Sequence, residues 1–166
     1  QAGFKVIYDP MYGSGINTMH LLLPDAEQIH NEFNPAFADI DHPEPMGEYL
    51  GALIGRIKSG GFTVGLATDG DADRLGAVDE HGNFVDSHRI FVLLMKYLYE
   101  DRKQRGAVAK TISLTTMVND YCTRKKIKLH ETAVGFKHIA KLMTTEKIVI
   151  GGEESGGLGT AIHIPE

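Results

Sequence analysis

The chain has 166 residues, of which 42% are hydrophobic and 23% are charged, a composition typical of a globular protein with a real core. Its formal net charge of −5 and the absence of a basic run argue against DNA or RNA as a partner. The single cysteine, Cys122, excludes an internal disulfide, and no stretch is apolar for long enough to span a membrane, so we expect a cytoplasmic protein.

The first half of the chain alternates between strand and helix patterns. Three prolines within 34–45 rule out a helix there and favour an extended connection. The other patterns predict, in chain order, a strand over 4–9, a glycine-led helix over 13–23, a strand over 26–33, a helix from Met46 to Gly60, a strand over 62–68 and a hairpin over 75–86 with His81-Gly82 at its turn.

The second half repeats the alternation, starting with a long amphipathic helix. The predicted elements are helix 87–105, strand 107–114, helix 115–126, strand 128–133, helix 135–145 and strand 147–154. Strands that alternate with helices of this length imply βαβ connections and mainly parallel sheets. We therefore expect the α/β class, with two consecutive mixed, mainly parallel α/β/α units over 1–85 and 86–166.

One acidic loop stands out, because Asp69, Asp71 and Asp73 alternate with small residues and are followed directly by Arg74. Three like charges this close repel each other unless a cation lies among them. Carboxylate oxygens favour Mg²⁺, Mn²⁺ or Ca²⁺ over zinc. Arg74 would be repelled by that cation unless an anion such as phosphate lay between them, so the pattern indicates a metal site that serves a phosphate.

Two alternatives compete with this interpretation. An EF-hand would match Asp at the first, third and fifth positions and Glu80 at the twelfth, but its sixth position needs Gly where this chain has Arg74. The flanking segments are also strand-like rather than helical. The second alternative is an acidic surface turn without a ligand.

The residues Thr-Asp-Gly-Asp-Ala-Asp-Arg over 68–74 resemble the metal-binding loop of the α-D-phosphohexomutases, the phosphoglucomutase/phosphomannomutase superfamily. That loop usually reads Asp-Gly-Asp-Gly-Asp-Arg, so Ala72 replaces its second glycine. Three other segments resemble the family in the expected order: 6–15 the opening of its second domain, 132–139 a loop of its third domain that approaches substrate, and 151–157 its sugar-binding loop.

The segment Gly-Gly-Glu-Glu-Ser-Gly-Gly over 151–157 follows a predicted strand, and ligands of open α/β sheets bind beyond the carboxyl ends of strands. A carboxylate and a hydroxyl can together bind neighbouring sugar hydroxyls, and flanking glycines let the backbone approach a ligand. The resemblance implies that Glu153 and Ser155 bind the hexose. Lys110 and Lys137 are candidate phosphate contacts, because each lies at or near the end of a strand.

The resemblance implies domain 2 over 1–85 and a truncated domain 3 over 86–166, with Mg²⁺ on the acidic loop. The family's serine motif and its C-terminal phosphate loop have no match here, and the ends at Gln1 and Glu166 resemble cut points. We therefore expect a piece of a longer enzyme, inactive alone, whose domains 1 and 4 lie elsewhere in the same protein.

In this family, a phosphoserine of domain 1 exchanges phosphoryl groups with a hexose 1- or 6-phosphate through a bisphosphate. The sequence leaves glucose and mannose undecided as the substrate sugar. Phosphoglucosamine mutases usually have Gln where Glu154 stands, which favours glucose or mannose. Two alternatives stay open: a non-catalytic module that binds a divalent metal, and a fragment of a phosphoglucosamine mutase.

Overall fold

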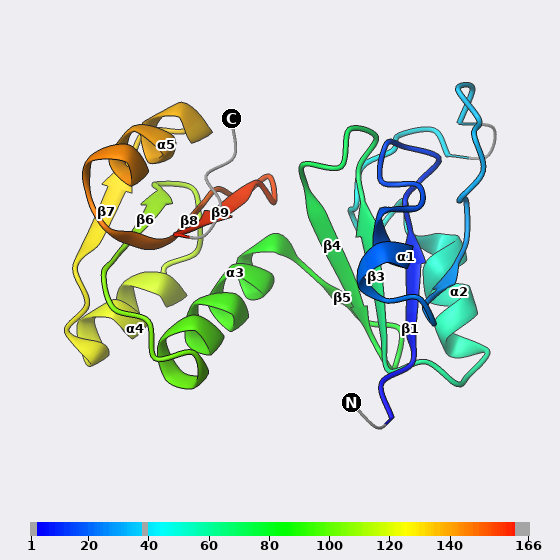
Figure 1. Ribbon diagram of the computed structural model, residues 1–166, viewed down its shortest axis with the longest axis horizontal. Helices are drawn as coiled ribbons and strands as arrows, with labels where there is room; N and C mark the ends of the chain where they lie inside the picture. Colours follow the sequence, from blue (N-terminus) through cyan, green and yellow to red (C-terminus); the bar gives the residue numbers. More distant parts are fainter. Residues whose placement is uncertain (1–2, 38–39, 162–166) are drawn as a thin grey trace. The chain divides into compact units, whose positions relative to one another are not determined.

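The computed structural model describes residues 3–37 and 40–161, and the chain divides into two compact units, 1–86 and 87–166 (Figure 1). Each unit has its own mixed sheet and its own hydrophobic core, which confirms the α/β class expected from the alternating patterns. Within the described residues, no helix has the length and apolar character needed to cross a bilayer.

The N-terminal unit is a five-stranded sheet in the order β2-β1-β3-β4-β5. Strand β1 runs parallel to β2 and β3, whereas β3, β4 and β5 are antiparallel neighbours. Its elements are β1 (Val6–Asp9), α1 (Thr18–Leu22), β2 (Glu27–Gln28), α2 (Gly51–Lys58), β3 (Val64–Thr68), β4 (Leu75–Asp79) and β5 (Phe84–Val85).

Helix α2 covers one face of this sheet with the apolar stripe predicted from the sequence. Leu53 and Ile57 are one turn apart, and both are buried against Gly65 of β3, where any side chain would meet them. On the other face, Tyr8 is buried and its hydroxyl lies 2.7 Å from the hydroxyl of Thr68. The central strands are therefore covered on both sides.

The C-terminal unit is a four-stranded sheet in the order β7-β6-β8-β9. Strands β7, β6 and β8 are parallel, and β9 is antiparallel to β8. Its elements are α3 (Ser87–Lys96), a π-helical turn η1 (Tyr97–Asp101), β6 (Ala107–Thr111), α4 (Met117–Lys125), β7 (Leu129–Thr132), α5 (Phe136–Thr145), β8 (Ile148–Gly152) and β9 (Leu158–Thr160).

Helices cover both faces of this second sheet, with α3 and α4 on one face and α5 on the other (Figure 1). Two adjacent glycines of β8 make this packing possible, since neighbouring strand residues face opposite sides. A Cβ on Gly151 would lie 2.4 Å from Ile139 of α5, and one on Gly152 would lie 2.7 Å from Phe91 of α3. The absence of a side chain at these two glycines thus lets α5 and α3 pack closely on the sheet, in addition to any role near a ligand.

Several elements differ from their predicted lengths for local reasons. The helix expected over 87–105 becomes a π-turn at Tyr97 and ends at Asp101, because Lys103 adopts a left-handed φ of 54° that a helix cannot continue. The strand expected over 26–33 keeps only the two residues of β2. Strand β9 had no periodic signal, since its three residues are held by pairing with β8.

We predict that Gly151→Ala destabilises the protein by about 1–3 kcal/mol, because the added methyl group overpacks the contact with Ile139. Gly55→Ala is the matched control: Gly55 is exposed on α2 and has nothing within 4 Å of an added Cβ. That control should gain about 0.5–1 kcal/mol from helix propensity. Urea denaturation followed by circular dichroism measures both, and equal effects would contradict the packing explanation.

Candidate functional site

The acidic loop begins where β3 ends and is built around the carboxylate of Asp69, whose side chain is fully buried. Its oxygen Oδ1 accepts the backbone N–H of Arg74 at 3.0 Å, which closes the loop before β4 starts. The backbone N–H of Ala72 donates to the Asp69 carbonyl at 3.1 Å, and Ala72 has a φ of 63°. The chain therefore curls tightly between β3 and β4.

Two other segments of the N-terminal unit support the loop from behind. The backbone N–H of Ser14 donates to the Gly70 carbonyl at 2.9 Å, and the Gly70 N–H donates to the Pro43 carbonyl at 3.1 Å. Gly13 lies so close that a Cβ there would be 2.5 Å from the Gly70 oxygen. The segment after β1 and the proline-rich connection thus position the loop through backbone contacts.

The three loop carboxylates converge, because one oxygen of each of Asp69, Asp71 and Asp73 lies within 4.8 Å of the others. Burial and the neighbouring charges of Asp69 and Asp71 raise the pKa of the Asp73 carboxyl. Burial also acts to raise the pKa of Asp69, but hydrogen bonds from Arg74 outweigh it and hold that pKa below its usual range. Repulsion between the carboxylate of Asp73 and those of Asp69 and Asp71 is therefore not fully offset by Arg74.

Arg74 lies over the same loop and is about one third exposed. Its Nε donates to Asp69 Oδ2 at 2.5 Å, and Nε lies 3.6 Å from Asp73 Oδ1. Its Nη1 lies 3.4 Å from Glu44 Oε1, a contact that the sequence did not indicate. The guanidinium is thus positioned by carboxylates, with part of its surface open to solvent.

The acidic loop fits a hard divalent cation by the chemistry of its donors. All three candidate ligands are carboxylates, the donors that Mg²⁺, Mn²⁺ and Ca²⁺ take in proteins. A carboxylate oxygen has two lone pairs, so Asp69 can keep its bonds to Arg74 and still offer an oxygen to an ion. The EF-hand alternative loses its structural context, since strands β3 and β4 flank the loop.

The loop 153–157 connects β8 to β9 and is closed by its own backbone. The Glu153 N–H donates to the Gly157 carbonyl at 3.0 Å. The two residues predicted to bind sugar are brought together, because the Ser155 hydroxyl donates to Glu153 Oε1 at 2.8 Å. The second oxygen, Glu153 Oε2, is buried and has no hydrogen-bond partner among the described residues. A buried carboxylate oxygen without a donor is costly, so this atom is suited to accept from a ligand hydroxyl.

Glu154 points the other way and ties the loop to β6. Its Oε2 accepts the hydroxyls of Ser113 and, at 2.9 Å, of Thr111, and its carbonyl accepts the Ser87 hydroxyl at 2.6 Å. Burial acts to raise the pKa of Glu154, but the hydroxyl of Ser113, a backbone hydrogen bond and the hydroxyl of Thr111 outweigh it and lower that pKa. Sequence reasoning missed Thr111 and Ser113 as partners of Glu154, because only the strand order places β6 beside β8.

The two predicted phosphate-binding lysines lie in different surroundings. Lys110 is buried on β6, and its ammonium donates to the Leu114 carbonyl at 2.8 Å and lies 3.0 Å from Glu131 Oε1. Both partners belong to the fold and hold Lys110 near the end of β6. Lys137 is exposed in the first turn of α5. Its position leaves the ammonium accessible to an anion.

Comparison with known proteins gives a consistent picture for both units. Residues 1–82 match the description phosphoglucomutase/phosphomannomutase, alpha/beta/alpha domain II, and residues 86–165 match domain III of the same family. A phosphoglucosamine mutase of Clostridium beijerinckii is 40% identical over 168 residues. That alignment covers 93% of this chain but only 35% of the relative, so the chain spans about a third of that protein.

Solved structures agree with the sequence comparison. A Thermus thermophilus protein described as a phosphomannomutase superposes with a TM-score of 0.87 at 32% identity, over 98% of this chain and 38% of its own. An N-acetylphosphoglucosamine mutase of Aspergillus fumigatus, solved with GlcNAc-6P and magnesium, shares the fold with a TM-score of 0.69 at 16% identity, over 93% of this chain and 35% of its own. The chain belongs to the phosphoglucomutase/phosphomannomutase family, of which it carries domains II and III.

Proposed function

We propose that this chain supplies the metal-binding and sugar-binding loops of a phosphohexomutase, which interconverts the 1- and 6-phosphates of a hexose. The observation that carries the proposal is the convergence of Asp69, Asp71 and Asp73 within 4.8 Å in a chain of this family. A non-catalytic metal module would need the same loop, but it would give no reason for a buried, unpartnered carboxylate oxygen on Glu153.

In this proposal, Asp69, Asp71 and Asp73 hold Mg²⁺. Bound there, the ion would act as a Lewis acid that offsets the negative charge on phosphoryl oxygens. The presence of magnesium in the fungal mutase of the same fold supports the choice of ion. Arg74 keeps its contacts with the loop carboxylates and presents its remaining N–H groups to a phosphate.

The sugar-binding role rests on the geometry of the second loop. Glu153 Oε2 accepts a hexose hydroxyl and Ser155 adds a second contact, while Glu154 holds the loop against β6 through Thr111 and Ser113. Lys137, which is accessible at the start of α5, is the proposed contact for a phosphate group of the substrate. By the family pattern the phosphoserine belongs to domain I, which is not among the matched domains, so we expect no turnover by this chain alone.

The substrate is a hexose phosphate, and a specific finding favours a second candidate sugar. The Clostridium beijerinckii relative at 40% identity is a phosphoglucosamine mutase, whereas the Thermus thermophilus neighbour is described as a phosphomannomutase. Glu154 accepts two hydroxyl hydrogen bonds here, and a glutamine oxygen could accept them too. Position 154 therefore acts by holding the loop in place. It does not distinguish glucose, mannose and glucosamine phosphates as the substrate.

We predict that Asp71→Asn weakens Mg²⁺ binding by about tenfold or more, because it removes one of three converging charges. The Asp71 side chain is exposed, so the melting temperature in the absence of metal should stay within about 2 °C of the parent. Isothermal titration calorimetry measures the affinity, and Asp25→Asn, an exposed aspartate away from the loop, is the control. Equal Mg²⁺ affinities of the two variants would contradict the proposed metal site.

The sugar loop yields a second prediction. Glu153→Gln and Ser155→Ala should each weaken binding of glucose, mannose or glucosamine 6-phosphate by about tenfold, since each removes an acceptor or donor that we assign to a hexose hydroxyl. Saturation-transfer NMR with the three sugar phosphates gives the affinity order and thereby the preferred sugar. Glu80→Gln, at the tip of an exposed hairpin, serves as the control, and parallel losses there would contradict the assignment.

Glu154 provides a prediction on pH. Because the pKa of Glu154 is lower in the folded chain than the ordinary value of 4.5, its stabilising effect is complete above that value and is lost as pH falls through the lower, folded value. Glu154→Gln should therefore cost about 1 kcal/mol at pH 7, and the difference from the parent should shrink below pH 4.5. Urea denaturation at pH 7 and in the acid range tests this, and a constant difference would contradict it.

A further inference from the structure

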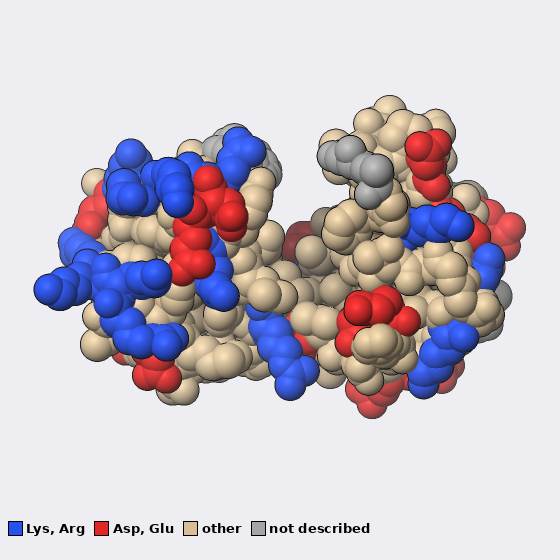
Figure 2. Space-filling model, turned by 90° about the horizontal axis from the view of Figure 1, so that it is seen from below, with Lys and Arg blue, Asp and Glu red and all other residues tan. Residues whose placement is uncertain are grey.

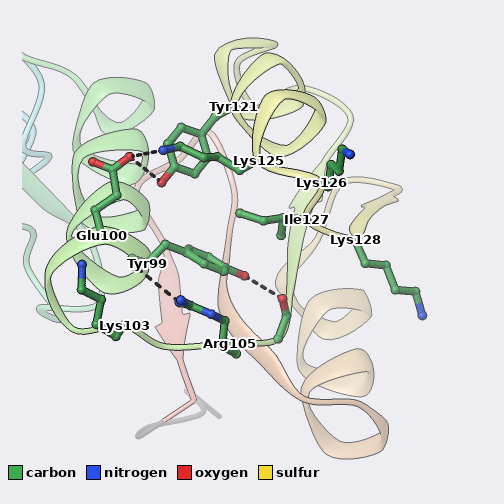
Figure 3. A pocket seen from close by; sticks show the side chains of 10 residues that line it. Tyr99, Glu100, Lys103, Arg105, Tyr121, Lys125, Lys126, Ile127 and Lys128 are labelled. Carbon is green, nitrogen blue, oxygen red and sulfur yellow. Dashed lines mark hydrogen bonds and ion pairs between the residues drawn. The ribbon is translucent and has the colours of Figure 1, made fainter.

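The C-terminal unit has a pocket at the end of its sheet opposite to loop 153–157. The pocket has a volume of about 450 Å³ and lies where β6 and β7 begin, lined in part by Gly106 and Ile127 (Figure 3). A five-residue strand is about 16 Å long, so the pocket lies roughly that far from the sugar loop, which follows the other end of the parallel strands. It is therefore a separate site.

The pocket concentrates positive charge in an acidic chain. Five of its lining residues are basic and one is acidic, whereas the whole chain has a net charge of −5. Figure 2, which views the molecule from below Figure 1, shows Lys and Arg side chains gathered over the C-terminal unit. The basic residues are Lys103, Arg105, Lys125, Lys126 and Lys128, and the acidic one is Glu100.

Two of these cations already have carboxylate partners. The ammonium of Lys125 lies 3.0 Å from Glu100 Oε1, and that of Lys128 lies 2.7 Å from Glu146 Oε2. The other three have no ion pair with any carboxylate in the described part of the chain. Arg105 donates to the carbonyls of Gln104 and Tyr99, at 2.9 and 3.5 Å. Three positive charges thus remain without a counter-charge.

The backbone carries two of these unpaired lysines in a conformation that usually belongs to glycine. Lys103 follows the π-turn with a φ of 54°, and Lys126 ends α4 with a φ of 55°. The negative end of the α4 dipole favours a cation at Lys126, but that effect is modest at an exposed position. Figure 3 shows Lys103 and Arg105 on one side of the pocket and Lys126 on the other, so basic residues line it from two segments of the chain.

Two buried tyrosines line the pocket between the basic residues. Tyr99 and Tyr121 are 7% and 5% exposed, and their hydroxyls donate to the Gly106 carbonyl at 2.9 Å and to Glu100 Oε1 at 3.1 Å. Burial, then the hydrogen bond to Glu100, raises the pKa of Tyr121 to about 12, so the ring stays neutral. Two tyrosines and Ile127 thus line the pocket together with its basic residues, and its volume falls within the range of roughly 300–1,000 Å³ seen for small-molecule sites.

We propose that this pocket binds a small phosphorylated molecule with more than one phosphate group, at a site distinct from the catalytic loops. Several adjacent phosphates match three unpaired cations, whereas the single carboxylate of Glu100 is already occupied by Lys125 and Tyr121. The phosphates lie at Lys103, Arg105 and Lys126, and the remainder of the ligand contacts the wall formed by Ile127 and the two tyrosines.

The test uses inorganic tripolyphosphate as the probe, with the 166-residue chain, EDTA and low salt, so that no divalent metal bridges the probe to the acidic loop. The double variant Lys103→Gln/Lys126→Gln removes two unpaired ammonium groups and spares the hydrogen bonds of Arg105. The control, Lys5→Gln/Lys58→Gln, removes the same charge from exposed positions of the N-terminal unit. Circular dichroism and melting curves verify that both variants are folded.

We expect tripolyphosphate to bind more tightly than orthophosphate, and the pocket variant to bind about tenfold more weakly than the control. Ser155→Ala should bind the probe like the parent, which separates this pocket from the sugar loop. Three results would overturn the proposal: no binding at millimolar probe, equal losses in the pocket and control variants, or tighter binding of a single-stranded oligonucleotide that depends on the same lysines. Arg105→Gln is the second variant if the double variant fails to fold.

Discussion

The placement of one buried carboxylate, that of Asp69, governs the proposed metal site. A buried charge must be fully hydrogen-bonded, and the backbone and guanidinium of Arg74 meet that requirement at both oxygens. Because Arg74 follows only five residues later, the chain has to turn back on itself. That turn brings Asp71 and Asp73 beside Asp69, so three charges that repel one another share one small volume. The hydrogen bonds that close the loop therefore also bring together the negative charges that favour the binding of a cation.

In the C-terminal unit, a loop lies at the carboxyl edge of a sheet that helices cover on both faces. Gly151 and Gly152 admit a helix on each side, which leaves the strand β8 fully buried up to its last residue. Glu154 then anchors the loop to the hydroxyls of Thr111, at the end of the neighbouring strand β6, and of Ser113, which follows it. Glu153 is left with one buried oxygen that has no hydrogen-bond partner among the described residues. The packing of the sheet and the proposed sugar contact thus involve four consecutive residues, 151–154.

The two ends of this sheet differ in chemistry because three of its four strands, β7, β6 and β8, run parallel. Their carboxyl ends present hydroxyls and carboxylates, which suit a sugar. Lys126 follows α4 just before β7, and Lys103 and Arg105 lie between the π-turn and β6, so basic residues gather at the amino ends of these two strands. In our two proposals, the direction of the strands therefore places the sugar contacts and the anion contacts at opposite ends of the sheet.

Local patterns in the sequence determined most of the architecture: alternating strand and helix periods gave the α/β class, and the spacing of Asp69, Asp71 and Asp73 gave the candidate metal loop. These features depend on residues near one another in the chain. What only the tertiary structure decided were contacts between distant residues. The order of strands brought Thr111 and Ser113 to Glu154, placed Lys110 beside Glu131, and paired β9 with β8. Such pairings depend on which strands become neighbours, and no local period of side chains encodes that choice.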